Sequence, residues 1–297
     1  MRQSIPGVAL MLCVACGCHQ DGPPAPCCGP LVSAYPLAKG TSWQYSYYSA
    51  IYNIRTTDTT AILQIDTVSG FSTVVVAGDT VLGPSGAQGG DSVRVTMITE
   101  AHVQLAPEVT VSSGPGLCQF YSVGGSGMYL EGYSGIGKLS LPKISPRPLA
   151  MRVAGGSYSS TRELVRSLLG MPNSVSDEPI VREIPPKLAL RLPLVIGDSW
   201  TFRPAAGSFR IDKQVTGEEE FTVSGKTYSC AVVHWIYSLG SGTPSTAISI
   251  ADLISPIGLL KRTIDVKDVT ITTATNPDSA GLMDYREEYF ATEVHAN

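Results

Sequence analysis

Hydrophobic and polar residues alternate with a period of two along most of this chain. In residues 93–97, for example, Val93, Val95 and Met97 share one face, and polar residues stand between them. This alternation is typical of antiparallel strands that bury one face. The pattern predicts strands at residues 61–66, 72–77, 92–98, 119–123, 127–131, 219–223, 226–237, 259–273 and 285–294.

Two short features refine the pattern in the second half of the chain. Ser224-Gly225 separates two predicted strands and is typical of a two-residue hairpin turn. In residues 259–273, the apolar positions change parity between Val266 and Val269. Because side chains alternate along a regular strand, this slip indicates a β-bulge.

One segment has a helical pattern instead. Residues 160–163, Ser-Thr-Arg-Glu, have the spacing of a capping box, and Gly170 is a typical C-terminal stop. We therefore predict one short helix of about three turns at most, packed on a sheet face or an open end. Its apolar stripe consists of Leu164, Val165, Leu168 and Leu169.

A ten-residue pattern occurs twice. Residues 36–45 and 193–202 both read Pro-Leu-x-x-Gly-x-Ser-Trp-x-aromatic. We interpret each copy as an apolar approach, a glycine turn and the start of a strand. The period of two places both aromatic residues of a copy on one strand face. They are expected to fill a core, and they are also the candidate ligand-binding residues: Trp43, Tyr45, Trp200 and Phe202.

Composition agrees with a mainly β protein. The 297 residues suffice for one large or two small domains with a real core. Thr, Ser, Val, Gly and Tyr are abundant, and long helical patterns are scarce. Residues 172–186 form a polar connection that contains proline. The β-rich region 31–297 is therefore either one domain or two lobes, 31–171 and 187–297.

Charge argues against one class of partner. Only 15% of the residues are charged, and the net charge is −4. A nucleic-acid surface needs clustered Lys and Arg, so no nucleic-acid partner is expected.

The N-terminus indicates export and anchoring. A basic start, Met1-Arg2, precedes an uncharged apolar run up to Ala15, and Cys16-Gly17-Cys18 follows. This order predicts a signal peptide over residues 1–15, because the apolar run is too short to span a bilayer. A cysteine at the cleavage point resembles the lipobox of bacterial lipoproteins. Cys16 is the favoured lipidation site, with Cys18 as the alternative; an ordinary signal peptide would leave both as plain thiols.

The resemblance to lipoproteins implies a place in the cell. A lipid on the N-terminal cysteine would tie the chain to a membrane of the bacterial cell envelope. Neither candidate cysteine is followed by Asp, which resembles the rule for outer-membrane sorting. The expected location is therefore the outer membrane, facing the periplasm or the surface. Residues 16–30 would be a tether rich in Gly and Pro that holds the domain off the membrane.

The remaining cysteines allow two kinds of chemistry. Only Cys118 and Cys230 lie within the predicted domain, where they are either a disulfide or two buried thiols. The tether cysteines and His19 could bind a soft metal, but their spacing fits no standard zinc motif. No metal or other cofactor is expected.

Further motifs resemble a known group. Val223 to Cys230 forms a Val-x-Gly-x-aromatic type of hairpin. Ser255-Pro256-Ile257-Gly258-Leu259 resembles a Pro-Gly-x-Gly-Leu-Val-Lys-like strand entry but lacks its first Gly. Together with the two Trp motifs, these segments resemble uncharacterised bacterial envelope lipoproteins with Pro-Leu-x-x-Gly-x-x-Trp motifs. The resemblance implies a strongly curved antiparallel sheet with one short helix, as a half-barrel of the LolA/LolB carrier type or as two related β-lobes. It implies no catalytic residues.

The chain lacks the familiar catalytic motifs. It has no Gly-x-Ser-x-Gly elbow, no His-Glu-x-x-His, no phosphate loop and no calcium loop. We therefore predict a non-enzymatic envelope protein that binds an apolar ligand or a lipid. One alternative is a structural or assembly scaffold that binds envelope proteins, and another is a hydrolase of unknown substrate. A concave, aromatic-lined cavity would favour the ligand-binding protein. An apolar patch on the outer surface would favour the scaffold.

Overall fold

The structure is a computed structural model of the whole chain. It describes residues 29–56, 67–83, 92–106, 112–113, 117–134, 150–153, 155–159, 161–171, 180–204, 209–239, 242–273 and 276–297. The predicted signal peptide, Cys16, Cys18 and the predicted strand 61–66 lie outside these residues, as do Cys27, Cys28 and His19.

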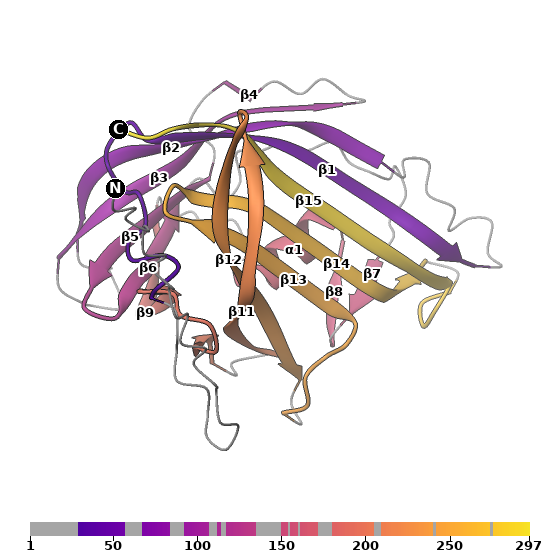
Figure 1. Cartoon of the computed structure of the whole chain (residues 1–297). Helices are drawn as coiled ribbons and strands as arrows, with labels where there is room; N and C mark the ends of the chain where they lie inside the picture. Colours follow the sequence, from indigo (N-terminus) through magenta and orange to yellow (C-terminus); the bar gives the residue numbers. More distant parts are fainter. Residues whose placement is uncertain are drawn as a thin grey trace, which may run out of the picture.

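The protein is mostly antiparallel β-sheet, as predicted. A single sheet curves round until it nearly closes like a barrel (Figure 1). Its strands are β1 (Ser42–Arg55), β2 (Thr67–Leu82), β3 (Val93–Ala106), β4 (Ser112–Ser113), β5 (Cys118–Gly124), β6 (Gly127–Ser134), β7 (Ala150–Val153), β8 (Gly156–Tyr158), β9 (Ile180–Arg191), β10 (Ser199–Arg203), β11 (Phe209–Val223), β12 (Lys226–Leu239), β13 (Ile248–Ser255), β14 (Gly258–Thr272) and β15 (Gly281–His295).

The strand order reveals two consecutive meanders. The path runs β10-β11-β12-β13-β14-β15-β1-β2-β3-β5-β6-β9, and the short β4, β7 and β8 lie off it. The first meander, β1 to β9, and the second, β10 to β15, each begin with one of the two Trp motifs. β15 pairs with β1 along most of its length, so the two meanders share one sheet.

The predicted two lobes therefore do not correspond to separate sheets. Part of the expected connection, residues 172–186, belongs to β9, which begins at Ile180. β9 pairs with β6 of the first meander and leads through a short segment into β10. Proline at positions 185 and 186 is tolerated there because β9 is at one end of the strand order.

The turn and the bulge predicted in the second half are confirmed. Ser224 and Gly225 have φ values of 50° and 77°, which is the left-handed pair that a type I′ hairpin requires. The register of β14 against β15 shifts between Val266 and Val269, where the apolar positions change parity. Strand β13 was missed by the sequence pattern.

The predicted helix is present as α1 (Thr161–Leu168). Glu163 accepts hydrogen bonds from the backbone N–H and the hydroxyl of Ser159, and Ser160 lies outside the described residues. At the other end, Met171 N donates to Arg166 O, and Gly170 N donates to Ser167 O. These two bonds make a Schellman motif with Gly170 at its left-handed position, φ 71°.

Helix α1 packs inside the curve of the sheet. Leu164 and Leu168 are fully buried, and the hydroxyl of Tyr237 on β12 donates to Leu168 O at 2.7 Å. A Cβ on Gly170 would lie 3.0 Å from the Phe202 ring of β10. The helix therefore covers part of the interior, behind β13 and β14 in Figure 1. No helix within the described ranges is long and apolar enough to cross a membrane.

Of the two alternatives for Cys118 and Cys230, the structure shows two buried thiols and not a disulfide. Cys118 belongs to a small cluster with Leu82, Val95 and Phe120, and its thiol donates to Thr99 Oγ1 at 3.3 Å. Cys230 belongs to the main core cluster, where burial raises its pKa to about 11. A disulfide needs Cα atoms closer than about 7 Å, and these thiols lie in separate clusters.

Candidate ligand-binding cavity

A cavity of about 270 Å³ lies in the interior of the curved sheet. All twelve strands of the main path contribute at least one side chain to its wall. Most of these side chains are aromatic or aliphatic, because alternation directs one face of every strand inward. Leu169 and Met171, which follow α1, Tyr35, which precedes β1, and Leu117, which precedes β5, complete the wall.

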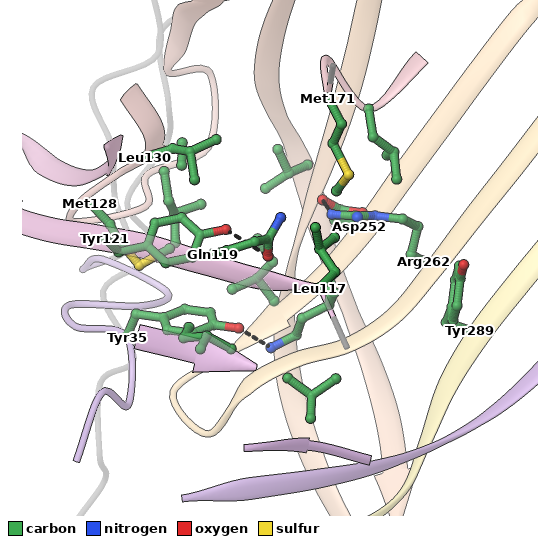
Figure 2. A pocket seen from close by; sticks show the side chains of 18 of the residues that line it. Tyr35, Leu117, Gln119, Tyr121, Met128, Leu130, Met171, Asp252, Arg262 and Tyr289 are labelled. Atoms are coloured by element: carbon green, nitrogen blue, oxygen red, sulfur yellow. Dashed lines mark hydrogen bonds and ion pairs between the residues drawn. The ribbon is translucent and has the colours of Figure 1, made fainter. Parts of the chain in front are cut away.

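Tyrosine hydroxyls near β14 find backbone partners. Tyr45 donates to Leu259 O at 2.8 Å, and Tyr35 accepts a hydrogen bond from Leu259 N at 3.3 Å. Burial raises the pKa of Tyr35 to about 12. Figure 2 shows Tyr35 and Tyr121 on one side of the cavity, and Met171, Asp252 and Arg262 on the other.

Cations and aromatic rings alternate across β9 to β14, and all but Lys187 line the cavity. The Arg262 guanidinium lies 5.1 Å from the centre of the Trp235 ring. Lys213 Nζ lies 3.8 Å from the same ring centre and 4.4 Å from that of Phe202. Lys187 Nζ lies 6.0 Å from Phe202 on its other side. We call Lys187, Phe202, Lys213, Trp235 and Arg262 the cation–aromatic stack; contacts of this kind strengthen when water is excluded.

The Arg262 end of the stack is an ion pair. Arg262 Nε and Nη2 donate to Asp252 Oδ1 and Oδ2 at 2.6 and 2.8 Å, which is a bidentate arrangement. The Trp235 indole donates to Asp252 Oδ2 at 3.0 Å. Burial works against the charge on Arg262, but the Asp252 carboxylate keeps the pKa of Arg262 above its usual range.

Lys213 stands at the centre of the stack and is 5% exposed. Its Nζ donates to Ala189 O on β9 at 2.9 Å. Burial lowers the pKa of Lys213 to about 7; the Asp252 carboxylate opposes this shift, and the Arg262 charge adds to it. Near neutral pH, the ammonium therefore exists together with the neutral amine.

A second buried polar group lies close to the cavity on β15. Glu287 accepts hydrogen bonds from the hydroxyls of Tyr47, at 3.2 Å, and Tyr285. Burial raises the pKa of Glu287, and these tyrosine hydroxyls oppose the shift. The ring of Tyr289, whose centre lies 5.0 Å from that of Tyr47, lines the cavity.

The structure brings together three of the four candidate ligand-binding residues. Trp43, Tyr45 and Phe202 line the cavity. Trp200 is buried but is not part of the wall, because its indole instead donates to Leu188 O on β9 at 3.1 Å. All four are core residues as predicted.

Sequence reasoning missed the polar wall residues Lys213, Asp252, Arg262 and Trp235. A signal existed for Lys213, because Ile211, Lys213 and Val215 share one strand face. A lysine between two apolar inward positions indicates a buried charge. The pairing of Asp252 with Arg262 could not be read from the chain, because it depends on the register of β13 against β14.

The described part of the chain contains no group of three or more His, Cys, Asp or Glu side chains that could hold a metal ion. In comparisons with known proteins, the chain matches no family model, no curated protein and no solved structure.

Proposed function

We propose that this protein is a lipid-anchored, non-enzymatic protein of the bacterial envelope that binds a small, largely apolar molecule inside its curved sheet. The cavity supports this proposal, because its wall is mainly aromatic and aliphatic and includes a few charged groups. Such a composition is typical of small-molecule sites. The N-terminal sequence supports the anchor.

The cavity volume limits the size of the ligand. Small-molecule pockets commonly measure about 300–1,000 Å³, and this cavity measures about 270 Å³. A single short chain or one ring system fits that volume, whereas a lipid with two long acyl chains does not. The proposal is therefore a small amphiphile or hydrophobe and not a whole phospholipid.

Native mass spectrometry tests the proposed binding. The full chain carrying Cys16→Ser and Cys18→Ser, which removes both candidate acylation sites, would be purified without detergent. We expect a noncovalent adduct that is lost on denaturation. Val74→Phe places a larger side chain in the cavity wall and should abolish the adduct. Val75→Phe, on the opposite strand face, is the matched control and should retain it. An adduct that survives Val74→Phe would place binding elsewhere.

Metabolic labelling tests the proposed anchor separately. Cells expressing the full chain would be fed an alkynyl fatty acid, and the purified protein would be checked for label. Cys16→Ser should remove the label and Cys18→Ser should retain it. The opposite result would move the lipid to Cys18, and label that survives the double variant would refute lipidation at either cysteine.

A further inference from the structure

We infer that the cavity binds an anionic amphiphile whose carboxylate sits beside Lys213 and whose short apolar tail fills the aromatic part of the cavity. This inference rests on the proposed function and adds the chemical class of the ligand. Three observations support it: the charge balance of the cation–aromatic stack, a buried donor without a partner in the same wall, and the apolar remainder of the cavity.

The cation–aromatic stack carries one positive charge that no carboxylate neutralises. Arg262 pairs with Asp252 at 2.6 Å, and Lys187 pairs with Glu183 at 2.6 Å. Among the described residues, no carboxylate oxygen lies within 4.0 Å of Lys213 Nζ, the third cation. An ammonium has three donors, and its described acceptor is Ala189 O. Lys213 can therefore donate to a ligand in the cavity.

Tyr133 supplies the second observation. Its ring lines the cavity and is fully buried. Within the described residues, its hydroxyl has no hydrogen-bond partner. Leaving a buried hydroxyl unsatisfied costs about 1–3 kcal/mol, and a carboxylate, which only accepts hydrogen bonds, would supply the missing partner.

The rest of the wall matches an apolar tail. Ile98, Leu130, Val233 and Ile254 line the cavity together with the aromatic residues of β1 and β5. Glu100 also lines it, but its carboxylate accepts a hydrogen bond from Ser72 Oγ at 2.6 Å. A ligand with a carboxylate at the cation–aromatic stack and an aliphatic tail against these side chains would match both the charged and the apolar parts of the wall.

Binding of such a ligand should depend on pH. A carboxylate stabilises the ammonium form of Lys213, whose pKa in the empty cavity is about 7. The charged groups that act on its pKa are Asp252 and Arg262. Lys187 lies over the Phe202 ring, and the other titratable groups that line the cavity are Glu100, Tyr35, Tyr45, Tyr121, Tyr133 and Tyr289. Above pH 7, binding must take up a proton, so the affinity should fall by up to about tenfold per pH unit. A neutral ligand should not show this dependence.

Calorimetry with octanoate and octanol tests the inference on the full chain with Cys16→Ser and Cys18→Ser. We expect octanoate to bind at least about tenfold more tightly than octanol at pH 6.5. Lys213→Met keeps an unbranched side chain that is one heavy atom shorter, and it removes the charge. It should weaken octanoate binding about tenfold to hundredfold, leave octanol within about threefold, and abolish the pH dependence.

Tyr133→Phe is a second variant with little risk to folding, and circular dichroism would verify that both variants fold. It should weaken octanoate binding about threefold to tenfold and spare octanol. If octanol binds as tightly as octanoate, or if folded Lys213→Met retains octanoate affinity, the anionic class is wrong and the proposed function stands. If neither probe binds and no adduct is found, both fail.

Discussion

The two Trp motifs adopt the same turn but lie at different places in the sheet, one where β15 meets β1 and the other where β9 meets β10. Gly40 and Gly197 have φ values of 90° and 93°. Their N–H groups donate to Val76 O, at 2.9 Å, and to Val215 O, at 2.8 Å, on the next strand of each meander. The return bonds, from Val76 N and Val215 N, are also equivalent. A local sequence that recurs thus builds the same local structure twice.

The two junctions differ in how strands meet. After the first motif, β1 runs for 14 residues and pairs with β15 through a backbone ladder. After the second, β10 runs for only 5 residues. Among the described residues, β10 contacts β9 through side-chain hydrogen bonds. The Trp200 indole donates to Leu188 O, and Arg191 Nη1 donates to Ser199 O. We call β15–β1 the closed junction and β9–β10 the seam.

A motif therefore sets its own turn, whereas the neighbouring strands decide what its side chains contact. The Trp43 indole donates to Ile257 O at 2.7 Å and its ring lines the cavity. The equivalent Trp200 bridges the seam instead. Lys213 also bridges it through Ala189 O, so the proposed anion site borders the less regular junction.

Hydrogen exchange offers the largest contrast between the junctions. Amides in the β15–β1 ladder should exchange only on global unfolding, which costs about 5–15 kcal/mol in typical domains. Amides on the seam edges of β9 and β10 should exchange through local opening, several kcal/mol more easily. Equal protection at both junctions would show that the seam is as closed as the ladder.

Removing either tryptophan should separate stability from binding. Trp43→Ala and Trp200→Ala should each lower the free energy of unfolding by about 3–5 kcal/mol, because both indoles are buried. Only Trp43→Ala changes the cavity wall. We therefore expect denaturant titration to show similar losses, and the octanol affinity to change only for Trp43→Ala. A change of octanol affinity in Trp200→Ala would contradict the placement of that residue.

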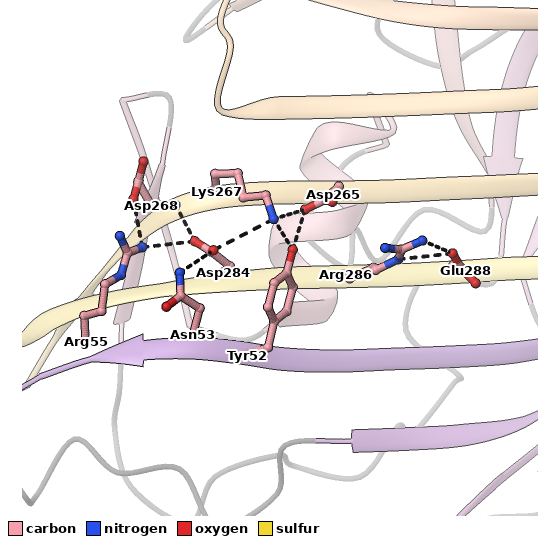
Figure 3. Close-up of polar contacts among 9 residues, drawn as sticks. All are labelled: Tyr52, Asn53, Arg55, Asp265, Lys267, Asp268, Asp284, Arg286 and Glu288. Atoms are coloured by element: carbon pink, nitrogen blue, oxygen red, sulfur yellow. Dashed lines mark hydrogen bonds and ion pairs between the residues drawn. The ribbon is translucent and has the colours of Figure 1, made fainter.

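The polar network at the closed junction should matter more than the ion pair at the seam. Asp284 on β15 is 5% exposed, and it accepts hydrogen bonds from Asn53 Nδ2 at 2.9 Å and Asp268 N at 3.0 Å (Figure 3). Arg55 Nη2 lies 3.1 Å from its Oδ1. Asp284→Asn should cost about 1–3 kcal/mol at pH 7. Asp198→Asn, which removes the exposed Arg191 pair at 3.8 Å, is the matched control and should cost under about 1 kcal/mol.

The stability difference between wild type and Asp284→Asn should depend on pH. Burial raises the pKa of Asp284, but the hydrogen bonds from Asn53 and Asp268 and the nearby Lys267 and Arg55 outweigh it, so the pKa lies below the ordinary 3.8. The charge therefore stabilises the fold above pH 3.8 and ceases to do so as the pH falls through the lowered value. Stability curves of wild type and Asp284→Asn should converge there; a gap that stays constant would assign the effect to packing.

Matched glycine variants offer the smallest and most direct test of the two turns. Gly40→Ala and Gly197→Ala each put a Cβ on a left-handed backbone, which costs about 1–2 kcal/mol. Neither Cβ would meet backbone atoms: the nearest contact is the Asn297 side chain for Gly40, and nothing lies within 4 Å for Gly197. Thermal unfolding should therefore show similar losses. Losses that differ by more than about 1 kcal/mol would mean that the turns are not energetically equivalent.

Much of the fold could be predicted because its signals are local. The bulge near Val266, the turn at Ser224 and the stop at Gly170 each follow from a few neighbouring residues and their backbone preferences. Strand β13 escaped prediction because Asp252 stands at the same parity as Ile248, Ile250 and Ile254 and interrupts their alternation. The aromatic residues of the candidate site were predicted, but its charged residues were not. Alternation predicts apolar residues on an inward face, and a charged residue there is an exception.

Local chemistry thus accounts for the strands, the helix and the two Trp turns, because alternation, capping and left-handed glycine act over a few residues. Long-range register accounts for the rest. Pairing of β15 with β1 merges the two meanders into one curved sheet, and the register of β13 against β14 sets Asp252 on Arg262. The curvature of the sheet then buries Lys213 between the rings of Phe202 and Trp235, where no carboxylate of the described residues pairs with it. No local pattern encodes this environment, because it is built by strands that are far apart in the chain.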